Sequence, residues 1–81
     1  MHELSLAQGL LDQLLGLAEQ HGAEQILTVR VQIGGQAGIV IDSFIFGFDA
    51  VKTIDARTRN ANLEIQHVAG DDLILAQVEM E

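Results

Sequence analysis

The 81-residue sequence contains no cysteine, proline, tryptophan or tyrosine. Without cysteine, neither a disulfide bond nor a thiolate-bound metal can stabilise the fold. The only aromatic residues are three phenylalanines, although 48% of the residues are hydrophobic. A chain of this length forms one domain, residues 1–81, and buries only about 60% of the surface that its unfolded form exposes.

Basic residues and long hydrophobic runs are also scarce. Four Lys and Arg stand against twelve Asp and Glu, which gives a formal net charge of −8. Nucleic-acid binding needs clustered basic residues, so we expect no nucleic-acid partner. No apolar run approaches the ~18 residues of a membrane span, and no basic segment followed by an apolar stretch indicates a signal peptide. We therefore expect no membrane partner and a cytoplasmic location.

The first half of the chain predicts a helix and then a strand. A wide apolar stripe over residues 4–21 is typical of an amphipathic helix, and Gly22 is placed to end it. Apolar residues then alternate with polar ones over residues 27–33, with Leu27 as the first apolar position. This pattern predicts a strand with one buried face, which Gly34-Gly35 ends.

A second helix is predicted from an N-cap at Asp42 or Ser43 to Lys52. This segment and the residues before it are apolar on nearly every side, and one small sheet would not cover them. We infer a partner surface, most simply a second copy of the chain in a homo-oligomer; the alternative is that some of these side chains are exposed without a role. The apolar residues are Ile39, Val40, Ile41, Phe44, Ile45, Phe46 and Phe48.

The last part of the chain predicts two more strands, over residues 63–68 and 73–78. They are joined by Ala69-Gly70-Asp71-Asp72, a sequence that indicates a tight hairpin. The first two strands flank the second helix and can therefore pair in parallel, with a right-handed connection. The predicted fold is α/β (α+β), in the order α-β-α-β-β, with a three-stranded mixed sheet and two helices packed on it.

The N-terminal tripeptide Met1-His2-Glu3 is the main candidate for chemistry. A free amine, the following backbone nitrogens and the imidazole can surround one metal ion, and a planar set of four nitrogens suits Ni(II) or Cu(II). The amine has an ordinary pKa of about 7.7–8.0, so the metal competes with a proton for it. The site also requires that nothing precede Met1. The alternative interpretation is a frayed terminus that binds no metal.

The opening octapeptide Met1-His2-Glu3-Leu4-Ser5-Leu6-Ala7-Gln8 resembles that of the HypA family of hydrogenase nickel-incorporation proteins. Similar segments follow in the first helix, the strands and the region around residues 44–48. The resemblance implies nickel ligands from the Met1 amine, the His2 imidazole and backbone nitrogen, and the Glu3 backbone nitrogen. It also implies delivery of Ni(II) to NiFe hydrogenase, and in some cases urease, together with a HypB-type GTPase and a hydrogenase precursor.

One departure from the family concerns zinc. Members of the family normally carry two Cys-x-x-Cys pairs between their second and third strands, whereas this chain has no cysteine. We therefore expect the zinc module to be absent between Val68 and Asp72, leaving a single nickel-binding domain and no bound zinc.

Other residues offer weaker candidates. His21 suits the end of a helix, and His67 alternates with apolar residues as if at the edge of the core, so a metal role for either is the less favoured interpretation. No nucleophile lies at the spacing of a catalytic base, and we expect a carrier and not an enzyme. The competing hypothesis is a metal-free module that dimerises or docks on a partner of the maturation machinery.

Overall fold

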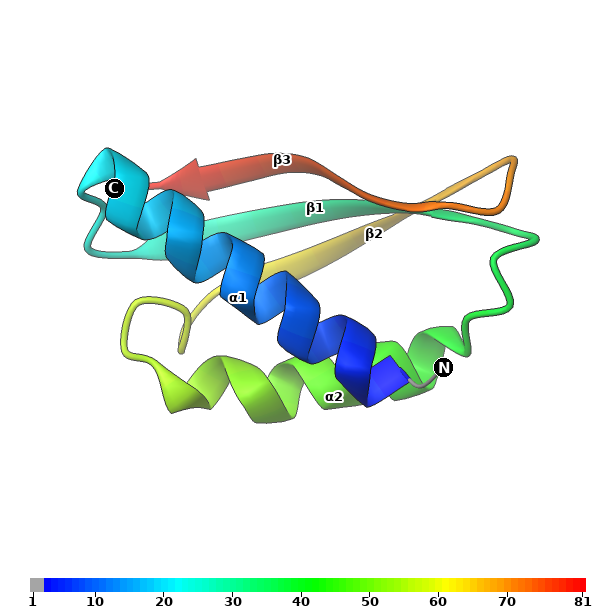
Figure 1. The fold of residues 1–81 in the computed structure, drawn as a ribbon, viewed down its shortest axis with the longest axis horizontal. Coiled ribbons are helices and arrows are strands. Elements are labelled where there is room, and N and C mark those ends of the chain that lie inside the picture. Colours follow the sequence, from blue (N-terminus) through cyan, green and yellow to red (C-terminus); the bar gives the residue numbers. More distant parts are fainter. Residues whose placement is uncertain (1–2) are drawn as a thin grey trace.

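The predicted order of helices and strands is confirmed in the computed structural model, which describes residues 3–81 (Figure 1). The central strand β1 (Ile26–Gly34) pairs in parallel with β2 (Asn62–Val68) and antiparallel with β3 (Leu73–Met80), so the sheet order is β2-β1-β3. The fold is therefore an α+β fold with a three-stranded mixed sheet. Its elements are α1 (Glu3–His21), β1 (Ile26–Gly34), α2 (Ile41–Val51), the 3-10 helix η1 (Lys52–Ile54), β2 (Asn62–Val68) and β3 (Leu73–Met80).

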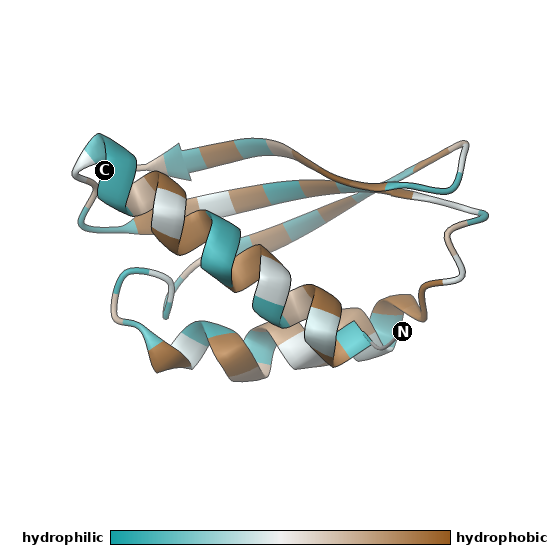
Figure 2. Cartoon of the chain, viewed as in Figure 1, coloured by the Kyte–Doolittle hydropathy of each residue, from teal (hydrophilic) through white to brown (hydrophobic). Residues whose placement is uncertain are grey.

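Both helices lie on one side of the sheet, which gives a two-layer molecule (Figure 1). Hydrophobic and polar residues alternate along the strands, as Figure 2 shows, so one face of the sheet joins the core. The opposite face carries polar pairs across the strands: Arg30 bonds Glu64 at 3.0 Å and also contacts Gln77. The core is formed by Ala7, Leu10, Leu11, Leu14, Ala18, Ile26, Val29, Val31, Ile33, Phe44, Phe48, Val51 and Ala61.

Helix α1 ends as the sequence predicts. Gly22 adopts a positive φ of 63°, which a glycine accepts without strain. The amide of Gly22 donates to the carbonyl of Glu19, and the amide of Ala23 donates to the carbonyl of Ala18 at 2.8 Å. These two bonds form a Schellman motif, in which the last carbonyl groups of the helix find donors.

The prediction that Leu27 lies on the buried face of β1 is wrong. Leu27 is exposed and Ile26 is fully buried. The pairing of β1 with β3 shifts register between Ile26 and Thr28, so the alternation of faces restarts there. From Val29 onward the predicted pattern holds, because Val29 and Val31 are buried.

The prediction of a tight hairpin between the last two strands is also wrong. Strands β2 and β3 run antiparallel to each other but lie on opposite sides of β1, so the connection between them crosses over the end of β1. The Gly34 amide donates to the Asp72 carbonyl at 2.8 Å, and the Gly35 amide donates to the Val68 carbonyl at 3.0 Å. A Cβ atom on Gly34 would collide with the backbone of Gly70, so glycine is required where the connection passes.

The loop between η1 and β2 is fastened to α1 by Arg57. Its guanidinium bonds the Glu19 carboxylate at 2.8 Å and the Asp55 carboxylate at 3.1 Å. The side-chain hydrogen bond from Arg57 lowers the pKa of Asp55, and the same bond raises the pKa of Arg57 above its ordinary value, with help from Glu19. Beside this pair, the buried Thr58 hydroxyl donates to the Lys52 carbonyl at 2.8 Å.

Within residues 3–81, neither helix combines the length and the apolar content that crossing a bilayer requires.

Candidate metal site

The described chain opens at Glu3, and the other two predicted ligand residues, Met1 and His2, lie outside the described residues. Glu3 is the first residue of α1 and is half-buried. Its carboxylate Oε2 accepts a hydrogen bond from the backbone amide of Val40 at 3.0 Å. The side chain of Glu3 is therefore directed to a second element of the fold.

Val40 is the N-cap residue of α2, with φ −80° and ψ 102°, and no side chain of its own segment caps that helix. The prediction of Asp42 or Ser43 as the N-cap is therefore wrong. Both lie inside α2, which begins at Ile41. The acceptor at this end comes from Glu3, the residue that opens α1. A carboxylate is favourable at a helix N-terminus, where the backbone dipoles leave partial positive charge.

The first two turns of α1 pack closely on α2. A Cβ atom built on Gly47 would lie 3.4 Å from the Cβ of Ala7 and 3.5 Å from the Cα of Leu4. Both values correspond to ordinary contact, so the space between the two helices at this point is no larger than one methyl group needs. The start of α1 is thus held against α2 by packing at Gly47 and by the hydrogen bond at Val40.

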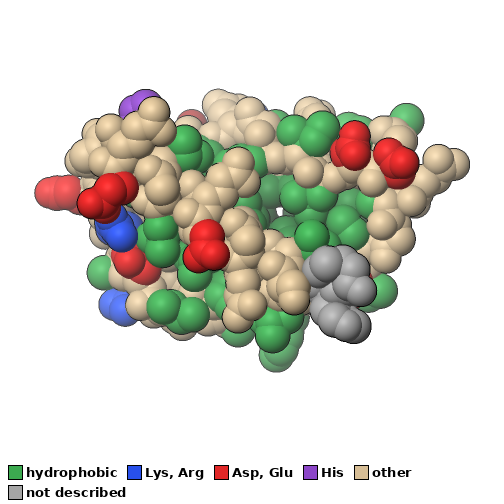
Figure 3. Space-filling model, viewed as in Figure 1, with side chains coloured by type: hydrophobic (Ala, Val, Ile, Leu, Met, Phe, Trp, Pro, Cys, Tyr) green, Lys and Arg blue, Asp and Glu red, His purple; other side chains and the backbone are tan. Residues whose placement is uncertain are grey.

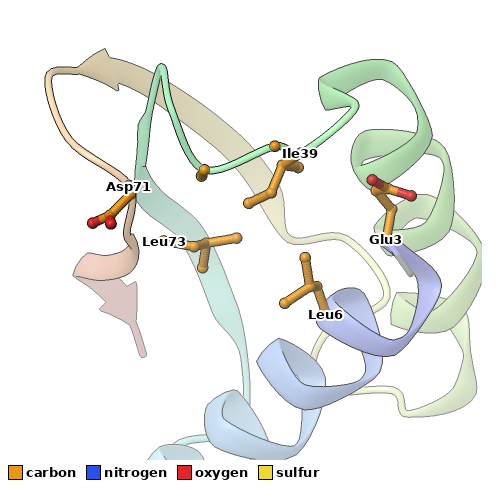
Figure 4. Close-up of a pocket in the computed structure, with 7 residues that line it drawn as sticks. Glu3, Leu6, Ile39, Asp71 and Leu73 are labelled. Atoms are coloured by element: carbon orange, nitrogen blue, oxygen red, sulfur yellow. The ribbon is translucent and has the colours of Figure 1, made fainter. Parts of the chain in front are cut away.

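A pocket of about 230 Å³ adjoins Glu3. It lies between the start of α1, the segment of residues 37–39 and the start of β3 (Figure 4). In Figure 4 the side chains of Leu6, Ile39 and Leu73 surround the opening, and Glu3 and Asp71 stand at opposite sides of it. Figure 3 shows the same region as a hollow with hydrophobic side chains around it.

The other candidate ligands do not come together. Within residues 3–81, no group of three or more His, Cys, Asp or Glu side chains is placed to hold a metal ion. His21 ends α1 and is exposed. His67 was predicted at the edge of the core, but its side chain is exposed on β2. A second pocket, lined by Arg30, Glu64, Ile65 and Gln66, contains an arginine that is already paired with Glu64.

The outer side of α2 confirms that the apolar residues around this helix exceed what the sheet covers. Phe46 is 76% exposed and Val40 is 58% exposed, whereas Phe44 and Phe48 are fully buried. Leu4, at the start of α1, is 50% exposed and lies next to Gly47. We call Leu4, Val40, Ile45 and Phe46 the α2 surface.

Comparison with known proteins identifies relatives along most of the chain. Residues 1–73 match the family described as "Hydrogenase/urease nickel incorporation, metallochaperone, hypA". The hydrogenase maturation factor HypA of Alkalilimnicola ehrlichii is 37% identical over 75 residues, which is 93% of this chain and 66% of the relative. The HypA of Roseiflexus sp. is 37% identical over 68 residues, 84% of this chain and 54% of the relative. The HypA of Albidiferax ferrireducens is 35% identical over 79 residues, which is 98% of this chain and 69% of the relative.

The chain therefore spans about half to two thirds of the length of the curated relatives that it matches. The fold is also similar to solved structures. The solution structure of the Ni metallochaperone HypA from Helicobacter pylori superposes with a TM-score of 0.79 at 17% identity, covering 100% of this chain and 94% of that one. A second solution structure of a HypA protein gives a TM-score of 0.73 at 16% identity. The match covers 100% of this chain and 92% of that one.

Proposed function

Because this chain belongs to the HypA family of hydrogenase/urease nickel-incorporation metallochaperones, we propose that it binds Ni(II) as cargo through Met1, His2 and Glu3. The observation that carries the proposal is that the family match begins at residue 1 and so includes this tripeptide. The Glu3 carboxylate anchors the start of α1 to α2. The last residue of the proposed site is therefore held in place by the fold.

The proposed ligands are the Met1 amine, the His2 imidazole and backbone nitrogen, and the Glu3 backbone nitrogen. Four nitrogens in a plane suit Ni(II). Binding releases protons from the amine and the backbone amides, so affinity falls as the pH drops below the ordinary pKa of an amine, about 7.7–8.0. A carrier of this kind acts by binding and releasing its cargo and does not catalyse a reaction.

We also propose where the nickel goes in the cell and which partners take part. The nickel is delivered to NiFe hydrogenase, and in some organisms to urease, with a HypB-type GTPase and the hydrogenase precursor as partners. Delivery takes place in the cytoplasm. Residues 1–81 form a nickel-binding domain in which the zinc module is absent between Val68 and Asp72, and we expect this domain to bind no zinc.

Titration of the untagged protein with Ni(II), followed by calorimetry and by absorption of the planar complex, tests the site. His2→Ala and the addition of one residue before Met1 each abolish binding, while His67→Ala, on the exposed side of β2, leaves it intact. Binding that survives either of the first two changes would remove the terminal site.

A second candidate function is favoured by the α2 surface. Its exposed Phe46 and Val40 suit a metal-free module that forms a homodimer or docks on a maturation partner. Sedimentation at several concentrations, with Phe46→Glu and with Ile74→Glu as an exposed control on β3, tests self-association. Only Phe46→Glu should reduce the dimer. An assembly state that is the same for both variants and the native protein excludes this surface.

A further inference from the structure

The hydrogen bond between Glu3 and Val40 joins the starts of two helices. In an ordinary capping box, a Glu or Gln at the third position of a helix reaches back to the amide of its own N-cap residue. In α2 that position is Ser43, which is exposed. The bond to the Val40 amide comes instead from Glu3, 37 residues earlier in the chain. The acidic half of a capping box is therefore supplied to α2 by a residue of another helix.

This arrangement bears on metal binding because closing a chelate ring requires the backbone to be fixed. Fixing the backbone of one residue costs conformational entropy, and affinity rises when that ordering precedes binding. Glu3 contributes both a backbone nitrogen to the proposed ligand set and the side chain that reaches Val40. A side chain anchored to α2 restricts the backbone of the same residue.

We propose that the Glu3 carboxylate is a positioning residue for Ni(II): through Val40 it orders the first turn of α1, so that the ligands close around the ion at lower cost. The carboxylate acts through the backbone, and its oxygen is not a nickel ligand. This inference rests on the proposed function. It adds to that function a role for a side chain that the ligand set leaves out.

The test compares Glu3→Ala, Glu3→Gln and the control Asp12→Asn. The glutamine side chain keeps an oxygen that can accept the bond from Val40, whereas alanine removes it. Asp12 is exposed on α1, so its substitution removes a negative charge from the same helix without touching Val40. The readouts are the Kd for Ni(II), the absorption of the planar complex and the hydrogen exchange of the Val40 amide, with denaturant unfolding to show that each variant is folded.

Glu3→Ala is expected to weaken Ni(II) binding about tenfold and to speed exchange of the Val40 amide, in keeping with the loss of one helix cap. Glu3→Gln stays within about threefold of the native Kd, and Asp12→Asn matches the native protein. Equal weakening by Glu3→Ala and Glu3→Gln would assign the effect to charge and overturn the positioning role.

An unchanged Kd in Glu3→Ala, with faster exchange at Val40, would overturn this inference alone and leave the nickel function intact. A native protein that binds no Ni(II) would overturn the proposed function and this inference with it. In that case the exchange rate at Val40 still reports whether the bond between the helices exists.

Discussion

The carbonyl group of Gly70 occupies the space that a Cβ atom on Gly34 would need. The contact arises because the connection from β2 to β3 passes over the end of β1. The Asp71 amide nitrogen is also only 2.8 Å from that position, so backbone atoms surround it and no flexible side chain can move aside.

We therefore expect Gly34→Ala to lower the free energy of unfolding by about 1–3 kcal/mol, the range of an overpacked core. Urea denaturation of the native and variant proteins measures the change. A variant as stable as the native protein would mean that the connection can shift away from β1 without loss.

Gly16→Ala is expected to have the opposite effect. Gly16 lies in the middle of α1, and a Cβ atom there would meet nothing within 4 Å. Glycine in a helix is about 0.8–1 kcal/mol less favourable than alanine. The free energy of unfolding should therefore rise by about this amount, and the urea midpoint should rise with it. A lower midpoint would indicate a neighbour at Gly16 in solution, which a dimer could supply.

Asp55→Asn is expected to reduce stability in a pH-dependent way. The pKa of Asp55 is lowered from 3.8 in the folded protein because its carboxylate accepts hydrogen bonds from Arg57. A lowered pKa contributes stability that is fully present above the unfolded pKa and is lost as the pH falls through the folded pKa. The difference in unfolding free energy between native and variant should therefore be constant from neutral pH down to near 3.8 and shrink below it.

Thermal or urea unfolding at several pH values measures this profile. Asp12→Asn, on the exposed side of α1, serves as the control and should show no comparable loss. A difference between native protein and Asp55→Asn that persists unchanged at the most acidic pH would contradict the role of the Asp55–Arg57 pair.

The two phenylalanines Phe44 and Phe46 should differ sharply. Phe44 is fully buried and Phe46 is 76% exposed, although only one residue separates them in α2. Phe44→Ala should cost about 3–5 kcal/mol of unfolding free energy, whereas Phe46→Ala should change it by less than about 0.5 kcal/mol in the monomer. Denaturation at low protein concentration measures both, and a loss for Phe46→Ala that appears only as the protein concentration is raised would show that a partner copy covers this side chain.

The sequence predicted the order of elements and the end of α1, because these depend on local patterns, and it predicted the parallel pairing of the first two strands, because a helix lies between them. It failed where a distant residue decides the outcome. The turn residues 69–72 indicate that the chain reverses. They carry no information on whether β2 and β3 pair with each other or with opposite edges of β1. The N-cap of α2 was missed for the same reason, since its partner is Glu3.

The candidate site was predicted from the N-terminal tripeptide, and it stays a prediction for all three residues, of which Met1 and His2 lie outside the described residues. The sequence offered no signal for the hydrogen bond from the Val40 amide to the Glu3 carboxylate. An acidic residue in the first turn of a helix is explained by the dipole of that helix alone. Its bond to Val40 depends on the packing of α1 against α2, which no local pattern describes.

The central position of β1 has a consequence for how the chain folds. Its cross-strand partners are distant in sequence: Arg30 bonds Glu64, 34 residues away, and Gln77, 47 residues away. Long-range pairing slows folding, since a large loop must close before any contact compensates for it. During translation α1 can form early, but β1 has to wait until most of the polypeptide has left the ribosome before it finds a strand on either side.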